Sequence, residues 1–343
     1  MKKRVTIKDV AAQAGVAYQT VSKVINGHAH VLPKTETRIW DAARALGYRA
    51  NHSARSLRAQ RSQMIGYSWV PTQPDQANHI LDMFLSSMVE EAEAAGYHLL
   101  PFPYREGEDL VGAYRELIES GRVDGFVLSS MNYNDPRVPF LQERQAPFVA
   151  FGRTDAQATF PFVDIDGAAG MRAATEHLLE RGHRRVAVLA WPEGSRVGDD
   201  RLAGYLAAMR AAQVDVKPEW LAHSAGDFEF GIAATQRWLD GAPAERPTAV
   251  VAMNDTLAVG AMSALLRQGL APGRDLAIVG FDDTPMAQYL WPPLSSVRQP
   301  IREAGHKCVE MLIRLLEKQP IPESQILLPP TLWVRQSSSA PTG

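Results

Sequence analysis

The segment TIKDVAAQAGVAYQTVSKVING, residues 6–27, has the apolar spacing of two short helices separated by a glycine. Thr6 can cap the first helix, with Asp9 three residues later as its capping-box partner. The apolar stripe of this helix consists of Ile7, Val10, Ala11 and Ala14. Gly15 ends the helix after about two turns. A second helix, over about residues 17–25, ends at the Asn-Gly pair that closes the segment.

A third helical pattern follows in residues 33–47. It begins at Pro33, a residue favoured in the first turn of a helix. Its apolar residues recur on one face: Ile39, Ala42, Ala43 and Leu46. Gly47 ends the pattern. Three short helices with a tight turn between the first two predict a helix-turn-helix unit.

The second of these helices has an apolar face and a polar face. On a helical wheel Val21, Val24 and Ile25 lie together and must pack against the first helix. The polar side chains left outside are Tyr18, Gln19, Ser22 and Lys23. Gln can pair with an adenine edge, Lys can donate to guanine, and Ser or Tyr can hold phosphates or base edges. The alternative is that these residues form the solvated side of a small helix.

Charge is distributed unevenly along the 343-residue chain, whose formal net charge is −2. Residues 1–61 hold twelve Lys and Arg against three acidic residues, a net charge of +9, and the remainder has a net charge of −11. A basic segment attached to an acidic body indicates a small module that binds a polyanion. The other explanation, a solubilising charged tail, fails because the basic residues are interleaved with the apolar helical pattern.

From residue 62 onward the pattern changes to strands that alternate with helices. The apolar runs that predict strands are 64–70, 98–103, 123–129, 148–152, 162–165, 186–191, 249–253 and 276–281. The amphipathic segments that predict helices include 81–95, 110–120, 168–181, 202–212, 257–268 and 301–318. Buried strands joined by crossover helices predict parallel sheets. Because roughly 270 residues exceed what one compact sheet needs, we expect two lobes. The fold class is therefore α/β, with an N-terminal all-α headpiece.

Composition argues against several other classes of protein. Cys308 is the one cysteine, so an intrachain disulfide and a Cys-based zinc site are excluded, as expected in a reducing cytosol. The first residues lack the apolar region of a cleaved secretion signal. The longest apolar runs are strand-sized, far below a membrane span. We therefore expect a cytoplasmic protein with no membrane partner.

The residue order of segment 6–27 resembles the amino terminus of the lactose-repressor (LacI/GalR) family of bacterial transcription factors. The match continues through AARALGY, residues 42–48, and NHSARSLR, residues 51–58. Two positions depart from the family pattern. Lys23 stands where Arg is commoner, which bears on base preference, and Ala50 stands where the family usually has Pro, which bears on entry into the hinge.

The resemblance implies that the headpiece binds an operator in double-stranded DNA. It makes Tyr18, Gln19 and Lys23 the main base-reading side chains, with Thr20 and Ser22 in support. The full set that we expect to contact DNA is Thr6, Tyr18, Gln19, Thr20, Ser22, Lys23, Asn26, Asn51, Ala54, Arg55, Leu57 and Arg58.

Residues 51–58 are expected to form a hinge helix that orders only on DNA. Such a segment is too short to hold a helix alone in water, because nucleation is costly below about 12–15 residues. DNA and a partner hinge would supply the missing contacts. Leu57, flanked by Arg55 and Arg58, then fits an apolar wedge between base steps of the minor groove. The alternative is that Leu57 packs on its own second domain.

The body resembles the periplasmic-binding-protein-like effector domain of the same family. The resemblance implies a helix-turn-helix domain at 1–49, a hinge helix at 50–61 and an effector-binding and dimerisation domain at 62–336. Within that domain we expect an N-lobe at about 62–163 and 294–325 and a C-lobe at about 164–293 and 326–336. Residues 337–343 are expected to be a disordered tail.

Ligands of open α/β sheets bind beyond the carboxyl ends of the strands. Trp69, Asp164, Asn254 and Asp282 each end or follow a predicted strand. The family resemblance adds Arg201, makes Arg201, Asn254 and Asp282 the leading contacts, and places Asp164 and Phe228 after them. The expected effector-binding set is Arg201, Asn254, Asp282, Asp164, Phe228, Trp69 and Trp291.

This residue set favours a sugar as the effector. Carboxylate, amide and guanidinium groups pair with hydroxyls, and aromatic rings cover the C–H faces of a sugar. The alternatives are a structural ion pair for Arg201 and Asp282, core packing for Trp220, Trp238 and Trp333, and a nucleobase as the ligand.

Catalytic motifs are missing from the chain: it has no P-loop, dinucleotide-binding, nucleophile-elbow or His-Glu-x-x-His pattern. The His28-Ala-His30 and Asp164-x-Asp166 spacings are weak metal signals, so we expect no metal, cofactor or enzymatic activity. The leading hypothesis is a repressor that binds a palindromic operator as a homodimer and responds to a mono- or oligosaccharide. The alternative is a sugar-binding protein or sugar-modifying enzyme with a basic extension.

Overall fold

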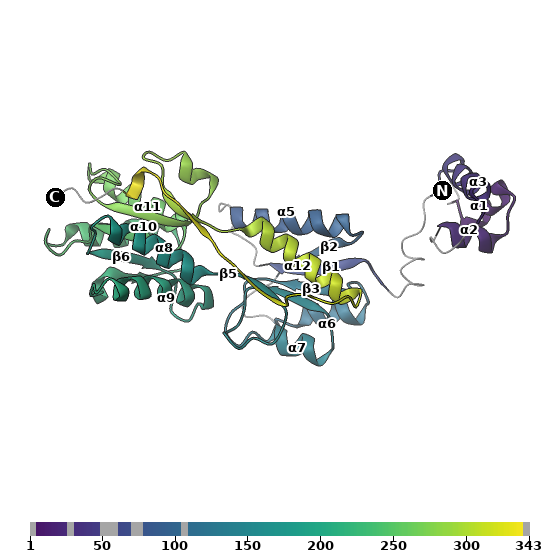
Figure 1. Ribbon diagram of the computed structural model, residues 1–343, viewed down its shortest axis with the longest axis horizontal. Coiled ribbons are helices and arrows are strands. Elements are labelled where there is room, and N and C mark those ends of the chain that lie inside the picture. Colours follow the sequence, from purple (N-terminus) through teal and green to yellow (C-terminus); the bar gives the residue numbers. More distant parts are fainter. Residues whose placement is uncertain (1–4, 26–30, 49–60, 70–77, 104–108, 339–343) are drawn as a thin grey trace. The chain divides into compact units, whose positions relative to one another are not determined.

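A computed structural model describes residues 5–25, 31–48, 61–69, 78–103 and 109–338. The chain divides into two compact units, Met1–Ser62 and Gln63–Gly343 (Figure 1). The first is the helical headpiece and the second contains both predicted lobes. None of the described helices is both long and apolar enough to cross a membrane.

The headpiece has the three predicted helices, α1 (Ile7–Ala14), α2 (Tyr18–Ile25) and α3 (Pro33–Ala45). Asp9 Oδ2 accepts hydrogen bonds from the backbone N and the hydroxyl of Thr6, both at 2.7 Å, so the predicted capping box is confirmed. Gly15 ends α1 with a φ of 60°, in the left-handed region that glycine tolerates. One apolar residue from each helix is fully buried at the centre: Val10, Val21 and Ile39.

The second unit contains two six-stranded sheets, one in each lobe. The N-lobe sheet has the order β11-β5-β4-β3-β1-β2, and its strands all pair in parallel. Its strands are β1 (Met64–Trp69), β2 (His98–Pro103), β3 (Gly125–Leu128), β4 (Phe148–Phe151), β5 (Phe162–Ile165) and β11 (Gln325–Leu328). Its helices are α5 (His79–Ala94), α6 (Gly112–Glu119), α7 (Arg137–Glu143) and α12 (Ile301–Leu316).

The C-lobe sheet has the order β12-β10-β9-β8-β6-β7, parallel except for the antiparallel edge pair β12–β10. Its strands are β6 (Val186–Ala190), β7 (Leu221–His223), β8 (Ala249–Ala252), β9 (Ala277–Asp282), β10 (Ser295–Arg298) and β12 (Thr331–Trp333). Its helices are α8 (Gly167–Glu180), α9 (Arg196–Ala211), α10 (Phe228–Asp240) and α11 (Asp255–Arg267). Short 3-10 helices lie at η1 (Pro218–Trp220), η2 (Pro285–Gln288) and η3 (Gln336–Ser338).

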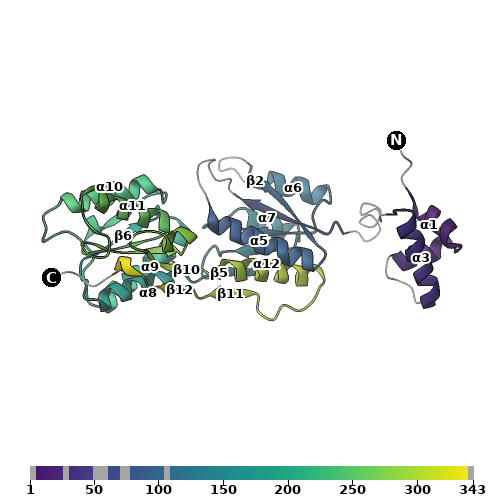
Figure 2. The same cartoon turned by 90° about the horizontal axis from the view of Figure 1, so that it is seen from above.

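Helices cover both faces of each sheet, as parallel sheets require (Figure 2). In the N-lobe, α5 and α12 bury apolar side chains against one face, and α6 and α7 against the other. In the C-lobe, α10 and α11 cover one face, and α8 and α9 cover the other. Each lobe is thus a three-layer unit, and the carboxyl ends of its parallel strands share one edge.

The structure moves the predicted lobe boundaries. Strand β10 pairs with β9 in the C-lobe sheet, so the predicted return to the N-lobe at residue 294 is wrong. The chain crosses instead at Gln299-Pro300, between β10 and α12, and crosses back after β11. Short strands such as β7, β10 and β12 carry too few residues for a periodic pattern to reveal them.

The predicted disorder of the tail is wrong at its first two residues. Ser337 and Ser338 are almost fully buried. Ser337 Oγ donates to the Ile278 carbonyl at 2.7 Å, and Ser338 Oγ lies 2.8 Å from His177 Nε2. Small polar side chains thereby fasten this part of the tail to the interior strand β9 and to α8. Residues 339–343 lie outside the described chain.

Candidate DNA-recognition helix and interlobe site

The α2 helix presents its polar residues on one exposed side. Val21 and Val24 are buried against the headpiece core, whereas Tyr18, Gln19 and Lys23 are exposed. Thr20 and Ser22 are partly buried, and Thr6 is exposed and paired with Asp9. The structure therefore brings the predicted base-reading side chains together, while their contacts with bases stay a prediction. Asn26, Asn51, Ala54, Arg55, Leu57 and Arg58 lie outside the described residues, as do His28 and His30.

The two lobes are joined by an ion-pair cluster around Arg153, a residue that follows β4. Its guanidinium lies 2.6 Å from Asp164 Oδ2 at the end of β5 and 2.7 Å from Asp200 Oδ2 on α9. Arg196, at the start of α9, lies 3.0 Å from the same Asp200 oxygen. Burial raises the pKa of the Asp164 carboxyl to about 6, an effect that Arg153 partly opposes.

Two more hydrogen bonds join the lobes beside this interlobe ion-pair cluster. Tyr133 Oη donates to Asp199 Oδ2 at 3.0 Å, and the Arg196 backbone N donates to Asn132 Oδ1 at 3.0 Å. Asp199 lies on the first turn of α9, like Arg196. The amino terminus of a single C-lobe helix therefore makes these contacts with the N-lobe.

Arg201 lies one turn further along α9, with a side chain only 4% exposed. Its Nη1 donates to the Met253 carbonyl after β8, and its Nη2 lies 3.9 Å from Asp282 Oδ1 at the end of β9. The guanidinium carbon stacks 3.8 Å from the Phe281 ring centroid. Burial lowers the pKa of Arg201 and raises the pKa of Asp282 to about 7. Arg201 and Asp282 thus form the ion pair that was the alternative to ligand binding, beside the ends of β8 and β9. Their role as ligand contacts stays a prediction.

Asp282 is further fixed by the chain crossover. Its backbone has a φ of 106°, a left-handed conformation that is strained for a residue with a Cβ. Gln299, in the crossover between β10 and α12, donates Nε2 to Asp282 Oδ1 at 2.7 Å. A pocket of about 390 Å³ lies beside this contact, and its lining includes His79 and Met83 of α5 together with Asp282 and Gln288. Side chains of both lobes therefore line the pocket that Asp282 borders.

Asn254 caps α11 and has both ends of its amide engaged. Oδ1 accepts from the Leu257 backbone N at 2.8 Å, and Nδ2 donates to the Gly226 carbonyl at 3.1 Å. Asn254 thereby ties α11 to the loop that leads into α10. Phe228, the half-buried first residue of α10, follows that loop.

The two predicted aromatic contacts lie in different settings. Trp69 ends β1 and is partly buried against the N-lobe core. Trp291 is 83% exposed, and its exposed neighbours along the chain are Met286 and Tyr289. Among the described residues, no ring contact, hydrogen bond or ion pair joins Trp291 to Arg201 or Asp282. Of the three tryptophans for which core packing was the alternative, Trp220 and Trp238 are buried, whereas Trp333 is 45% exposed.

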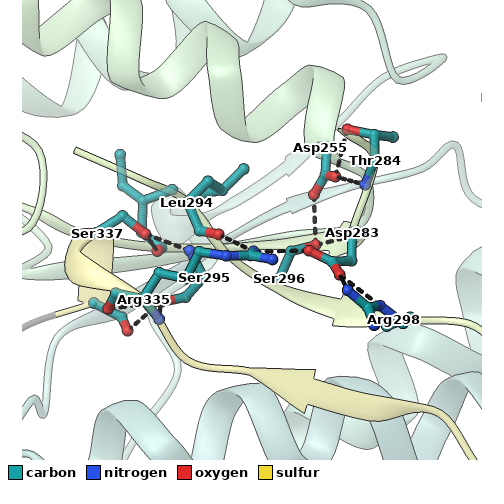
Figure 3. A network of polar contacts seen from close by, with 11 residues as sticks. Asp255, Asp283, Thr284, Leu294, Ser295, Ser296, Arg298, Arg335 and Ser337 are labelled. Carbon is teal, nitrogen blue, oxygen red and sulfur yellow. Dashed lines mark hydrogen bonds and ion pairs between the residues drawn. The ribbon is translucent and has the colours of Figure 1, made fainter. Parts of the chain in front are cut away.

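A network of polar contacts that includes Asp255 and Asp283 lies beside the ends of β9 and β10 (Figure 3). The buried Asp255 accepts from Ser296 Oγ at 2.6 Å and from the backbone N of Thr284 at 2.7 Å. The side chain of Asp283 is 1% exposed and pairs with Arg298 at 2.6 Å and Arg335 at 2.7 Å. Each acid directly follows a predicted ligand residue, so the network fixes the backbone from which Asn254 and Asp282 project.

Four residues of the interlobe site were missed from the sequence: Arg153, Asp200, Gln299 and Trp191. Arg153 and Trp191 closely follow strands, so the strand-end rule that selected Trp69 would also have found them. Asp200 and Gln299 gave no such signal, because the tertiary fold alone brings them to the strand ends. Among the described residues, no group of three or more His, Cys, Asp or Glu side chains could hold a metal ion.

Sequence and structure comparisons agree with this architecture. Residues 6–51 match the bacterial regulatory proteins of the lacI family, and residues 175–338 match the periplasmic binding protein-like domain. The chain is 31% identical to the HTH-type transcriptional regulator CelR of Thermobifida fusca, over 98% of this chain and 99% of CelR. It is 33% identical to the HTH-type transcriptional repressor PurR of Escherichia coli, over 97% of this chain and 96% of PurR.

Solved structures show the same arrangement. A LacI-family regulatory protein from Chloroflexus aggregans is 58% identical with a TM-score of 0.78, covering 80% of this chain and 98% of its own. The lac repressor dimer bound to operator and the anti-inducer ONPF is 28% identical with a TM-score of 0.86, covering 98% of this chain and 100% of its own. A CelR–cellobiose complex is 29% identical with a TM-score of 0.73, covering 97% of this chain and 100% of its own.

A helix-turn-helix headpiece attached to a two-lobed α/β domain defines a DNA-binding transcription regulator controlled by a small molecule. The chain belongs to the lacI family of bacterial regulatory proteins. It is a regulator of transcription and not an enzyme, which removes the sugar-modifying alternative.

Proposed function

We propose that this chain is a repressor that binds a palindromic operator as a homodimer and is controlled by a sugar bound between its lobes. The observation that carries the proposal is the position of Asp282, which ends β9, pairs with Arg201 of α9 and lines a pocket together with His79 and Met83 of the N-lobe. A ligand bound beside Asp282 would contact residues of both lobes and could therefore stabilise one arrangement of the lobes over another. Because its target is the bacterial chromosome, the repressor works in the cytoplasm.

The chemistry of the interlobe site supports a carbohydrate effector. Guanidinium and carboxylate groups stand beside aromatic rings, as Arg201 stands against Phe281 and Trp191. This combination suits hydroxyl groups and the apolar C–H faces of a sugar ring. One relative, CelR, has been solved with cellobiose.

An exposed apolar patch on the C-lobe supports the homodimer. The patch consists of Met286, Tyr289 and Trp291, which are 61%, 74% and 83% exposed. Clustered exposed apolar side chains mark interaction surfaces. The lac repressor has been solved as a dimer on its operator. Two headpieces related by a two-fold axis match an operator with two inverted half-sites. We therefore assign Trp291 to the dimer surface in place of the effector site predicted from the sequence.

Control by the sugar requires a difference in affinity between two arrangements of the lobes. Each tenfold ratio of affinities contributes about 1.4 kcal/mol per site to the shift. The interlobe ion-pair cluster and the Gln299–Asp282 contact both bear on that equilibrium, because each joins elements that move relative to one another when the lobes rearrange.

The test is to compare the full chain with a variant that lacks residues 1–61. A thermal-shift screen of neutral sugars and purines identifies the effector, and operator binding is measured with inverted-repeat duplexes selected from random sequence. The truncated chain should keep the sugar response and lose DNA binding. A full chain that shows no preference for any inverted repeat, with or without the sugars, contradicts the proposal.

A further inference from the structure

Trp191 lies at the sheet edge where Arg201, Asn254 and Asp282 gather. It directly follows β6, and its backbone N donates to Met253 Sδ at 3.2 Å. Its carbonyl accepts from His223 Nδ1 at 2.9 Å. Met253 follows β8 and His223 ends β7, so the two neighbouring strand ends fix the point from which the indole projects.

Two glycines make room for this indole. A Cβ on Gly198 of α9 would lie 3.0 Å from the Trp191 Cβ. A Cβ on Gly226 would lie 3.3 Å from Trp191 Nε1 and 2.8 Å from Asn254 Nδ2. Gly226 has a φ of 93°, which glycine adopts without strain. The loop that carries Gly226 is therefore shaped around the indole N–H.

The indole and its neighbour Arg201 each carry a buried N–H without an acceptor. Trp191 Nε1 and Arg201 Nε have no hydrogen-bond partner among the described residues. The Arg201 guanidinium carbon lies 4.8 Å from the Trp191 ring centroid, so the two side chains that carry these donors pack against each other. A buried donor without an acceptor is unfavourable. A ligand oxygen placed between them would remove that penalty in the bound state.

The charges around Trp191 and Arg201 favour a neutral ligand. Three arginines of the junction, Arg153, Arg196 and Arg201, face four carboxylates, Asp164, Asp199, Asp200 and Asp282. Burial already raises the pKa values of the Asp164 and Asp282 carboxyls, so this cluster disfavours negative charge and would disfavour an anionic ligand. Hydroxyl and acetal oxygens accept hydrogen bonds without adding charge.

We infer that Trp191 is a specificity-determining contact, whose Nε1–H donates to a hydroxyl oxygen of a neutral sugar. The Arg201 Nε–H donates to the same sugar, and the loop at Gly226 adjusts to admit it. This inference rests on the proposed function, because it assigns a new contact within the same interlobe site. It predicts that the site rejects a sugar that lacks the accepting oxygen, since both donors would stay buried and unpaired.

The experiment compares Trp191→Phe with Trp220→Phe as a matched control. Phe keeps an aromatic ring and removes the N–H. Trp220 is a buried C-lobe tryptophan whose Nε1 already donates to the Glu245 carbonyl at 3.2 Å. The full chain, labelled with ¹⁵N at its seven tryptophans, is titrated with a panel of neutral mono- and disaccharides, each beside its uronic acid. Affinities come from calorimetry, and the Trp191 indole signal is assigned by its loss in Trp191→Phe.

We expect a neutral sugar to bind and to move the Trp191 indole proton downfield, while the Trp220 signal stays in place. Trp191→Phe should bind that sugar at least tenfold more weakly, Trp220→Phe should bind it as the wild type does, and the matching uronic acid should bind weakly. Equal sugar affinity in Trp191→Phe overturns the inference and leaves the proposed function intact. If no sugar in the panel binds, the proposed sugar effector fails and the inference fails with it.

A second measurement needs no variant and covers the case in which Trp191→Phe does not fold. Monodeoxy derivatives of the bound sugar are titrated into the wild-type chain. One derivative should bind at least tenfold more weakly and leave the Trp191 indole signal at its unliganded position. If every deoxy derivative still shifts that signal and binds equally well, Trp191 does not read a sugar hydroxyl, and the inference is overturned.

Discussion

Arg153 and Asp200 form an ion pair of 2.7 Å that joins the N-lobe to the C-lobe. The pair is not isolated, because Arg153 also holds Asp164 and Asp200 also holds Arg196. The four side chains are between 7% and 23% exposed, so solvent screens them less than a surface pair. Removing Arg153 would leave Asp164 buried without its partner.

We therefore predict that Arg153→Met destabilises the joined lobes. The free energy of unfolding should fall by about 1.5–3 kcal/mol, the usual contribution of a hydrogen bond to a charged group. Sugar affinity should weaken at least threefold. Urea unfolding followed by circular dichroism, and calorimetric titration with the sugar, measure the two effects.

The matched control for this prediction is Arg172→Met. Arg172 pairs with Glu176 at 2.7 Å within α8, and both side chains are at least 40% exposed. Its loss should cost about 0–1 kcal/mol, as for other surface pairs. If Arg153→Met and Arg172→Met behave alike, the interlobe ion-pair cluster does not hold the lobes together.

We predict that the stability of the protein against unfolding depends on pH because of Asp282. Burial raises the pKa of its carboxyl to about 7 in the folded protein, whereas the unfolded value is about 4. Between these values the folded state binds the extra proton, so Asp282 favours folding at low pH and this contribution is lost as the pH rises through 7. The unfolding temperature of the sugar-free chain should therefore fall less between pH 6.5 and pH 8 in Asp282→Asn than in the wild type, by about 2–4 °C.

Asp275→Asn is the control for the pH prediction. A hydrogen bond from Arg274 lowers the pKa of Asp275, so this carboxylate stays ionised throughout that pH window. Its replacement should leave the slope between pH 6.5 and pH 8 unchanged. A wild-type slope that persists in Asp282→Asn would show that other groups govern it.

The parts of the fold that could be predicted are those with a distinct apolar pattern. The three headpiece helices and the strands 98–103 and 162–165 appear where the apolar spacing placed them. Strand β10 could not be placed in its lobe, because Ser295–Arg298 carries no pattern that distinguishes one sheet from the other. Its lobe is decided by pairing with β9, a contact between segments that the sequence does not reveal.

In the interlobe site, too, some residues could be predicted from the sequence and others could not. The strand-end rule and the family resemblance found Arg201 and Asp282, which the structure places together. Trp291 was predicted to line the site because aromatic residues suit sugars, yet it is 83% exposed beside Tyr289. Aromatic side chains serve sugar sites, cores and interfaces alike, so residue type alone could not choose among them. Arg153 closely follows β4 and so fits the strand-end rule, but its partner Asp200 lies on a helix of the other lobe, and only the tertiary fold brings the two together.

The apolar patch on the C-lobe predicts how the homodimer can be broken. Tyr289→Glu places a charge where a second copy would bury an aromatic ring, and an unpaired buried charge is strongly unfavourable. The variant should sediment as a monomer at micromolar concentration and lose most of its operator affinity. Leu327→Glu, at a 45% exposed residue of the N-lobe edge strand β11, is the control and should remain dimeric. A dimeric Tyr289→Glu would move the interface elsewhere.

We predict that substitution of Leu57 changes the affinity for operator DNA and leaves the affinity for the sugar unchanged. The residue lies outside the described chain, and its assignment rests on the family resemblance and on the flanking Arg55 and Arg58. Leu57→Ala removes the apolar wedge, so specific operator binding should weaken strongly while sugar affinity stays unchanged. Electrophoretic mobility shift and calorimetry measure the two quantities. Equal operator affinity in Leu57→Ala would favour packing of Leu57 on its own domain.

Gln19 predicts a loss of base discrimination that is confined to a small part of the operator. Its side chain is exposed on α2 beside Tyr18 and Lys23, while Val21 and Val24 anchor the helix in the headpiece core. Gln19→Ala should cost about 1–3 kcal/mol against the preferred base at one or two positions and leave the other positions unchanged. Gln13→Ala, at an exposed residue of α1, is the control and should leave every position unchanged. Competitive selection from a randomised inverted repeat measures both. A Gln19→Ala profile that weakens uniformly at all positions would show that Gln19 contacts the phosphate backbone, because phosphate contacts carry no direct sequence information.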